Sequence, residues 1–375
     1  MRSIVRLAAG LAAIALSAPA LAGPVTDCPN RDVPFSAASP LIDVLLSPAA
    51  KAVIDKHAPG RLDKMPPNFA GTKPPSFASI LTVDNATRFT GISADKVAEI
   101  DKELRALPVT AGDKVARCQR FDNDVPTLPA MPKGKVRLLV MEKINGFKDV
   151  PSVNAAHAAL TAMAERKGWA IAFTEKGGAI NARTLGQFDA VVWNNISGDI
   201  LTLSQRKALQ GFLARGGGFA AMHGSAGDPA YFWNWYPDKL IGARFTGHPM
   251  APQFQEARVI VSTDHPIAKA ANLPREWRMT DEWYSFKTSP RAAGAQVIAS
   301  LDEGSYTRKS PMGPDGYLDM GNDHPIAWTN CMGRGRMFYS AIGHMPQTYS
   351  QPQALALLEA GVEWAAKSKN ACPAK

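Results

Sequence analysis

The 375-residue sequence lacks the signatures of several common classes of protein. It has four cysteines and no Cys-x-x-Cys pair, so a cysteine-based zinc site is not expected. Its formal net charge is +9, but the basic residues are scattered and form no block, so we expect no nucleic-acid partner. Beyond residue 22, no apolar stretch approaches the roughly 20 uncharged residues of a membrane-spanning helix, so we expect no membrane span.

Familiar catalytic motifs are missing as well. A serine hydrolase carries its nucleophile at a sharp turn after a strand, in a Gly-x-Ser-x-Gly pattern. The corresponding turn of this sequence carries His223, and spacing supports no Ser-His-Asp set. The glycine run Gly216-Gly217-Gly218 precedes a strand rather than following one, which is the wrong place for a dinucleotide-binding loop, so we expect no nucleotide cofactor.

What is present begins with an expected export signal. Arg2 and Arg6 precede an apolar run over residues 7–16, and Ala20-Leu21-Ala22 supplies small residues before Gly23. This layout predicts a cleavable signal peptide over residues 1–22 and a mature protein that is periplasmic or secreted.

Export makes disulfides permissible for the four cysteines, which can pair in three ways. We favour Cys28 with Cys118 and Cys331 with Cys372, because each pair would tie one end of the chain to its own region. Free buried cysteines are the alternative.

The rest of the chain divides into two parts. Residues 23–132 are rich in proline and short helical patterns, with helices expected from Pro48 and from Asp95, and predict a small helical region followed by a linker. Residues 133–370 alternate between strands and helices, which predicts an α/β fold: a mostly parallel sheet with helices on both faces. The strands of its first half are expected at 135–141, 169–173, 189–194 and 219–222, and its helices at 152–167, 203–215 and 353–367.

His223 is the most promising functional residue of this second part. The strand Phe219–Met222 delivers it to its carboxyl end, where open α/β sheets bind their ligands, and Gly224 then lets the chain turn. An imidazole with an ordinary pKa near 6.5 can give or take a proton there.

Four other histidines follow His223 in the sequence. His344 ends the apolar run Ala341-Ile342-Gly343 and is expected at the same site. His265 and His324 stand between an aspartate and a proline, and we expect each in a turn that introduces a strand. His248 also precedes a proline, and site and structural roles remain equally open for it.

The segment Asp281-Glu282-Trp283-Tyr284 is a second dense group. Two adjacent carboxylates cannot face the same way in a strand, so we expect at most one to act and the other to bind backbone or a basic partner such as Arg244 or Arg278. A charged turn with the two aromatic residues packed beneath it is an equally open alternative. The aromatic residues Trp235, Trp283 and Tyr284 are expected either to stack on sugar rings or to belong to the core.

With these residues in view, the region of about residues 134–367 resembles the ThuA-like family, named for trehalose utilisation. The matching pieces are Gly216–Gly224, Trp235-Tyr236, Gly247-His248-Pro249, Asp264-His265-Pro266, Asp281–Tyr284, His324–Trp328, Gly333–Arg336 with Phe338-Tyr339, and Gly343-His344. The resemblance implies a flavodoxin-like sheet of the class I glutamine amidotransferase-like group and a role in sugar metabolism, plausibly on oxidised (keto) glycosides. It also places His223 where an amidotransferase carries its cysteine, so amidotransferase activity is not expected.

One position departs from the family pattern. Members often carry a histidine shortly after the first strand, whereas here Gly146-Phe147-Lys148 is followed by Asp149. If that histidine is a ligand or base in relatives, Asp149 replaces it as a ligand or carboxylate base, or the activity is lost.

Three functional hypotheses follow. The first is an exported enzyme that performs acid/base chemistry on a sugar or keto-glycoside. Its expected catalytic residues are His223, His248, Asp281, Glu282 and His344, and its expected substrate-binding residues are Trp235, Trp283, Tyr284, Asp149 and Arg336. The second is a non-catalytic carbohydrate-binding module. The third is an enzyme dependent on a divalent metal such as zinc, with His223, His248, His344 and a carboxylate as ligands.

Overall fold

The structure is a computed structural model that describes residues 24–367 and residue 372. The expected signal peptide, residues 1–22, lies outside the described residues. None of the helices in the described part is long and apolar enough to cross a membrane.

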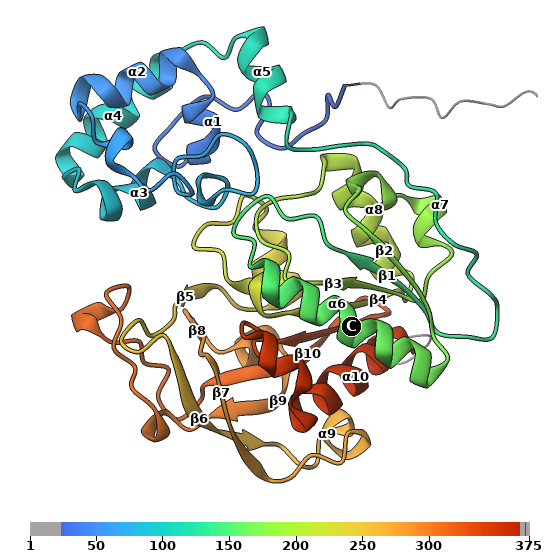
Figure 1. Ribbon diagram of the computed structural model, residues 1–375. Coiled ribbons are helices and arrows are strands. Elements are labelled where there is room, and N and C mark those ends of the chain that lie inside the picture. The colour runs from blue at the N-terminus through green and yellow to red at the C-terminus, as the bar shows by residue number, and fades with distance from the viewer. Residues whose placement is uncertain (1–23, 368–371, 373–375) are drawn as a thin grey trace, which may run out of the picture.

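The N-terminal region folds into a small group of helices with its own core (blue to teal in Figure 1). Its elements are α1 (Leu41–Leu45), α2 (Pro48–His57), α3 (Val83–Thr90), α4 (Ala94–Ala106) and α5 (Ala111–Cys118), with 3-10 turns η1 (Leu62–Lys64) and η2 (Phe77–Ser79). Helix α2 begins as predicted, because the Ser47 side chain accepts a hydrogen bond from the backbone N–H of Ala50. Ala50, Val53 and Ile54 form its buried face.

The second part is built on a nine-stranded sheet with the order β2-β1-β3-β4-β11-β10-β9-β6-β7. Its strands are β1 (Arg137–Met141), β2 (Ala170–Thr174), β3 (Ala190–Trp193), β4 (Gly218–Met222), β6 (Phe254–Val261), β7 (Glu276–Glu282), β9 (Gln296–Leu301), β10 (Pro325–Met332) and β11 (Gly335–Ser340). The five strands from β2 to β11 are parallel, and the other four continue the sheet in antiparallel pairs. A separate two-stranded sheet joins β5 (Phe245–Gly247) to β8 (Ser285–Phe286).

Helices cover both faces of the parallel half, which confirms the predicted α/β fold. Helices α6 (Val150–Lys167) and α10 (Pro352–Ala366) lie in front of the sheet in Figure 1, and α7 (Ala182–Leu185) and α8 (Leu203–Ala214) pack together on the other face. Strands β3 and β4 are buried along their whole length, as expected of strands enclosed on both sides. Helix α8 begins with a capping box of Thr202 and Gln205 rather than at Ser204.

The remaining elements are short. They are the helix α9 (Pro266–Ala270) and the turns η3 (Gly177–Ala179), η4 (His223–Ala226), η5 (Tyr236–Ile241), η6 (Pro290–Ala293), η7 (Glu303–Ser305), η8 (Pro314–Gly316) and η9 (Pro346–Ser350). His324 precedes a strand, as predicted, whereas the prediction for His265 was wrong. His265 caps α9, because its ring Nδ1 accepts the free N–H of Ile267 at 3.1 Å, an interaction that stabilises a helix start.

Both expected disulfides are present. Cys28 pairs with Cys118 and ties the start of the described chain to α5, and Cys331 pairs with Cys372 and ties its end to β10. The favoured pairing is therefore confirmed.

Candidate functional site

Strand β4 delivers His223 to the carboxyl edge of the sheet in a strained backbone conformation. Its φ is 30°, in a region that residues other than glycine rarely occupy. The backbone is held there by the Tyr339 hydroxyl, which donates to the His223 carbonyl at 2.9 Å. Strain of this kind costs on the order of 1–3 kcal/mol and collects at functional sites, where it aims a side chain.

Asp281 brings a second histidine to His223. One carboxylate oxygen of Asp281 accepts hydrogen bonds from the backbone N–H groups of His344 and Met345. The other oxygen accepts hydrogen bonds from the backbone N–H of Gly343 and from the Thr348 hydroxyl. The end of β7 therefore holds the loop after β11, although three strands separate β7 and β11 in the sheet.

Glu282 faces the histidines, because alternate residues of β7 point in opposite directions. Asp281 binds backbone, as expected of one of the two carboxylates. The suggested basic partners are not involved, since Arg244 pairs with Asp238 and Arg278 with Glu256.

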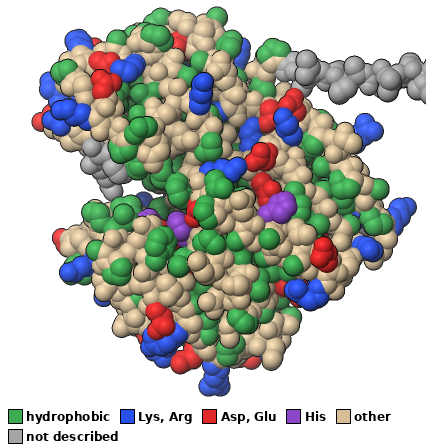
Figure 2. All heavy atoms as spheres, in the orientation of Figure 1, with side chains coloured by type: hydrophobic (Ala, Val, Ile, Leu, Met, Phe, Trp, Pro, Cys, Tyr) green, Lys and Arg blue, Asp and Glu red, His purple; other side chains and the backbone are tan. Residues whose placement is uncertain are grey.

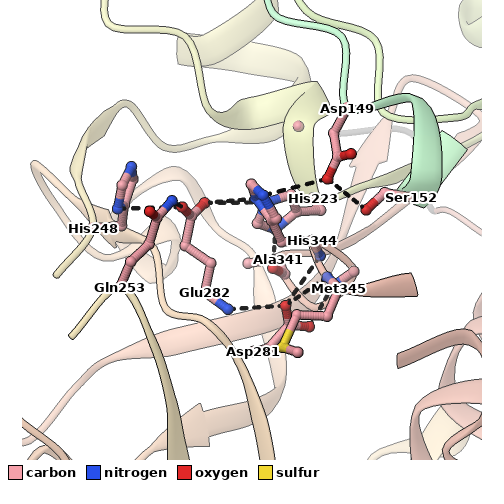
Figure 3. A network of polar contacts seen from close by, with 12 residues as sticks. Asp149, Ser152, His223, His248, Gln253, Asp281, Glu282, Ala341, His344 and Met345 are labelled. Atoms are coloured by element: carbon pink, nitrogen blue, oxygen red, sulfur yellow. Dashed lines mark hydrogen bonds and ion pairs between the residues drawn. The ribbon is translucent and has the colours of Figure 1, made fainter. Parts of the chain in front are cut away.

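The side chains of His223, Glu282 and His344 converge on one point (Figure 3). His223 Nε2 lies 3.0 Å from His344 Nδ1 and 3.3 Å from Glu282 Oε2, and His344 Nδ1 lies 3.0 Å from the same oxygen. Each ring nitrogen on the far side has a partner that can only accept a proton: the carbonyl of Ala341 for His223 and the carboxylate of Asp149 for His344. If both imidazoles are neutral, each points a nitrogen lone pair at Glu282. Because the two lone pairs and the carboxylate oxygen repel one another, a cation is needed between them, either a proton or a metal ion.

The pairing of Glu282 with the two histidines outweighs the effect of burial on the pKa values of Glu282 and His344. Burial alone would raise the pKa of the Glu282 carboxyl, but hydrogen bonds to His223 and His344 hold that pKa well below its ordinary value. Burial would lower the pKa of His344, yet its hydrogen bond and attraction to Glu282 raise it.

His248 and Asp149 flank the convergent group. His248 Nδ1 lies 3.3 Å from the other oxygen of Glu282, Oε1, and 2.9 Å from the carbonyl of Pro249. Burial lowers the pKa of His248, and Glu282 opposes this only in part. The same oxygen, Oε1, accepts the side-chain amide of Gln253. Asp149 lies 3.3 Å from His344 Nε2 and accepts the Ser152 hydroxyl, so it orients His344 from behind.

The geometry of the three converging atoms fits a divalent metal ion. Donor atoms bound to one zinc ion at about 2.0–2.2 Å lie roughly 3.0–3.6 Å from one another, which matches the three distances above. Two imidazoles and one carboxylate also form a common ligand set for zinc and other divalent ions. Among the described residues, this group is the one whose ligand atoms lie close enough together. The expected ligand His248 stands outside it, and Glu282 supplies the carboxylate of the expected set.

A cavity of 340 Å³ opens over this group, between the N-terminal helical region and the sheet. Figure 2 shows the two parts of the molecule separated by a hollow that hydrophobic and histidine side chains border. The N-terminal region contributes Phe69, Phe77, Ile80, Leu81 and Asn85, and the sheet side contributes Glu282, His344, His248, Tyr284 and Asp228 among others. The loop after β1 contributes Phe147.

Tyr284 is the one aromatic residue of the three expected at the site that borders the cavity. Its ring centroid lies 4.1 Å from that of His223, and its hydroxyl has no hydrogen-bond partner in the part of the chain that the structure describes. Trp283 is buried beneath the surface with its N–H on the Gln255 carbonyl, and Trp235 stacks on Trp233 away from the cavity. Neither tryptophan borders this cavity.

Arg336 is also misplaced by the sequence-based expectation. It lies near the start of β11, at the opposite edge of the sheet from His344, where it covers the ring of Trp364 and donates to the Trp364 carbonyl.

Sequence reasoning missed Asp228. This buried residue borders the cavity, where its carboxylate accepts the Ser197 hydroxyl at 2.6 Å and the N–H of Gly198 at 2.7 Å. Burial outweighs these hydrogen bonds and raises the pKa of Asp228 to about 7. No motif surrounds this aspartate, so only its spatial neighbours reveal it.

Comparisons with known proteins agree with the fold. The family model for ThuA, described as trehalose utilisation, matches residues 137–365. A solved structure of a putative ThuA-like protein from Bacteroides uniformis ATCC 8492 is 24% identical with a TM-score of 0.53, over 64% of this chain and 96% of that one. Another, from Parabacteroides merdae ATCC 43184, is 17% identical with a TM-score of 0.44, over 64% of this chain and 92% of that one. No curated protein matches the sequence.

Proposed function

The chain belongs to the ThuA (trehalose utilisation) family, and from this premise we propose that it is an enzyme acting on a sugar or keto-glycoside with a divalent metal ion at its centre. Family membership supports a carbohydrate-related role. The reaction, the metal and the site residues are the proposal. The metal ligands are His223, Glu282 and His344.

One observation carries the proposal: two imidazole lone pairs and a carboxylate oxygen face one point, and partners behind the rings fix both imidazoles in that orientation. Oriented ligands of this kind, each imidazole bonded through its other nitrogen, are typical of metal sites. A set of three protein ligands leaves a coordination position open, as in catalytic rather than structural zinc sites.

The surrounding side chains supply the rest of the chemistry. A divalent ion at this position would polarise a sugar carbonyl or hydroxyl, or lower the pKa of a bound water to about 7. The Tyr284 hydroxyl, which has no partner among the described residues, is free to donate a hydrogen bond to a substrate oxygen. His248 borders the cavity and can exchange a proton there.

Elemental analysis of protein purified without added metal tests the proposal. We expect about one zinc, manganese or iron per chain, and less than about a tenth of that in His223→Ala and Glu282→Gln, because two ligands hold an ion far more weakly than three. The matched control is His157→Ala, since His157 pairs with Glu142 on the surface of α6. It should retain the metal.

Turnover distinguishes the proposal from its rivals. On a panel of glycosides and keto-glycosides, the parent and His157→Ala should turn over the substrate. The variants His223→Ala and Glu282→Gln should lose turnover in proportion to the metal that they lose. Full turnover of metal-free protein would instead support acid/base chemistry by the histidines alone. Sugar binding that His223→Ala leaves unchanged, without turnover of any compound, would support a non-catalytic binding module.

We also propose that the protein acts after export, in the periplasm or outside the cell. The two disulfides among the described residues support this location, because disulfides persist in oxidising compartments. Mass spectrometry of the protein recovered from its host should find Gly23 at the amino terminus. An intact Met1 in the active, disulfide-bonded protein would contradict export through a cleaved signal.

A further inference from the structure

We propose that the cavity takes a glycoside whose aglycone is a flat, apolar ring, with the sugar at the Glu282 end and the ring beneath the N-terminal region. The position of the sugar rests on the proposed function, whereas the apolar subsite follows from the shape and lining of the cavity itself. A volume of 340 Å³ lies within the range of about 300–1,000 Å³ that small-molecule sites occupy.

Aromatic side chains line the cavity from the N-terminal region to the metal-binding group. Phe69 and Phe77 stack with their centroids 4.3 Å apart, Phe147 lies 5.2 Å from Phe77, and His344 lies 6.1 Å from Phe147. Together these four rings form a continuous wall along the cavity. Rings of this kind favour a flat aromatic neighbour, through stacked or edge-to-face contacts.

The polar groups of the cavity lie mainly at its other end. Glu282, His344, His248 and Tyr284 come from the sheet side, whereas Ile80 and Leu81 complete the apolar end. The cavity is therefore amphipathic, and its occupant should be polar at one end and apolar at the other.

This division disfavours a second sugar ring. A disaccharide would place several hydroxyl groups against Phe77, Ile80 and Leu81, where they lose bonds to water, and Asn85 is the one polar side chain that the N-terminal region adds to the lining. An aromatic ring loses no hydrogen bonds in the same place, and its burial is favourable.

The apolar end is a fixed part of the structure. The N–H of Ser76 donates to the Asn145 carbonyl at 3.0 Å, which joins the N-terminal region to the loop after β1. In the same loop Gly146 has no room for a side chain, since a Cβ would lie 2.6 Å from Ile80 Cγ2. Residues 69–85 also lie outside the segment that matches the ThuA family, so this subsite is an addition of the present chain to the family domain.

Calorimetry with the full chain tests the subsite. The probes are phenyl glucoside and methyl glucoside, each as both anomers, and trehalose. We expect phenyl glucoside to bind at least about tenfold more tightly than methyl glucoside, because only its ring fills the apolar end. Equal affinities, tighter binding of trehalose, or no binding of any probe would overturn the proposal.

Two variants locate the preference. Phe77→Ala should reduce the preference for phenyl to less than about threefold while the affinity for methyl glucoside stays the same. Phe147→Ala should act in the same direction, and it should be tolerated in folding because Phe147 is 39% exposed. The control is Phe173→Ala, which removes a ring that stacks on His157 away from the cavity. A preference that survives both cavity variants would place the phenyl group elsewhere.

Repeating the titrations after metal removal separates the two proposals. A preference for phenyl that persists without metal supports the subsite whether or not the metal proposal holds. Loss of turnover with the preference intact concerns only the metal group. A preference that is absent in metal-loaded and metal-free protein alike overturns the subsite and leaves the proposed reaction standing.

Discussion

At the scale of single residues, the adjacent carboxylates Asp281 and Glu282 have different roles in the site. Glu282 faces His223 and His344, whereas Asp281 is fully buried and accepts backbone N–H groups of the loop that carries His344. Because its oxygens each serve several donors, Asp281 positions His344 without itself reaching the cavity.

Asp281→Asn should therefore be costly. The new amide NH₂ would face N–H donors in place of an acceptor, and we expect a loss of about 2–3 kcal/mol in the free energy of unfolding. Urea denaturation measures this loss. The control is Asp238→Asn, whose exposed carboxylate pairs with Arg244 and should change stability by less than about 0.5 kcal/mol. Similar effects of the two changes would contradict the positioning role.

Asp228 should make stability depend on pH. Burial raises its folded-state pKa to about 7, so the folded chain binds this proton more tightly than the unfolded chain does, and stability falls as the pH rises from about 4 to about 7. Asp228→Asn removes this loss. A tenfold change in proton affinity corresponds to about 1.4 kcal/mol. From pH 4 to pH 8, the free energy of unfolding of the variant should therefore rise by more than about 1.4 kcal/mol relative to that of the parent. Denaturation at both pH values measures the difference, and parallel profiles would rule it out.

At the scale of elements, loops of the N-terminal region meet the loop after β1 and the start of α8. In the loop after β1, Asn145 donates to the carbonyl of Arg120, and Gly146 approaches Ile80 closely. At the start of α8, the N–H of Leu203 donates to the Asp27 carbonyl. The position of the apolar end of the cavity relative to the metal-binding group depends on such contacts.

Gly146→Ala should disturb this junction. Its Cβ would overlap Ile80 and Ser197, and overpacking of this kind costs about 1–3 kcal/mol. We expect lower thermal stability together with weaker binding of phenyl glucoside. Gly112→Ala is the matched control, because its Cβ would have room near the start of α5 and alanine favours a helix there by about 0.5–1 kcal/mol. If Gly146→Ala is as stable as its parent, the neighbouring side chains can move to accommodate the added Cβ, and the predicted overpacking is wrong.

At the scale of the whole molecule, two disulfides each serve a different part of the chain. Cys28–Cys118 closes a loop with a sequence separation of 90 residues around the N-terminal region, and Cys331–Cys372 closes one of 41 residues around the last helix. Loops of about these sizes predict a stabilisation near 4 kcal/mol each in the chain-entropy model.

Replacing Cys28 and Cys118 by alanine should therefore loosen the N-terminal region selectively. Limited proteolysis should cut within residues 60–110 while the sheet remains protected, and binding of phenyl glucoside should weaken. Replacing Cys331 and Cys372 should leave the N-terminal region resistant. Equal protection of residues 60–110 in both variants would show that the other contacts of this region suffice.

Much of the fold could be read from the sequence, because it depends on local patterns. Apolar strands, amphipathic helices and glycine stops predicted the parallel half of the sheet. The prediction for His265 failed because a residue before proline can cap a helix as well as lead into a strand. The sequence left the role of the tryptophans open because an aromatic residue is equally suited to the core and to a ligand.

The sequence by itself determined which residues could carry chemistry: a histidine at the end of β4, another after β11, and two carboxylates of which only one can face them. Only the tertiary structure decided which of these meet. His223, Glu282 and His344 lie far apart in the chain, and the fold brings their ligand atoms within 3.3 Å of one another, with Asp281 holding the loop that carries His344. The apolar end of the cavity was beyond prediction for the same reason: the packing of two separate cores forms it, and no local pattern encodes that contact.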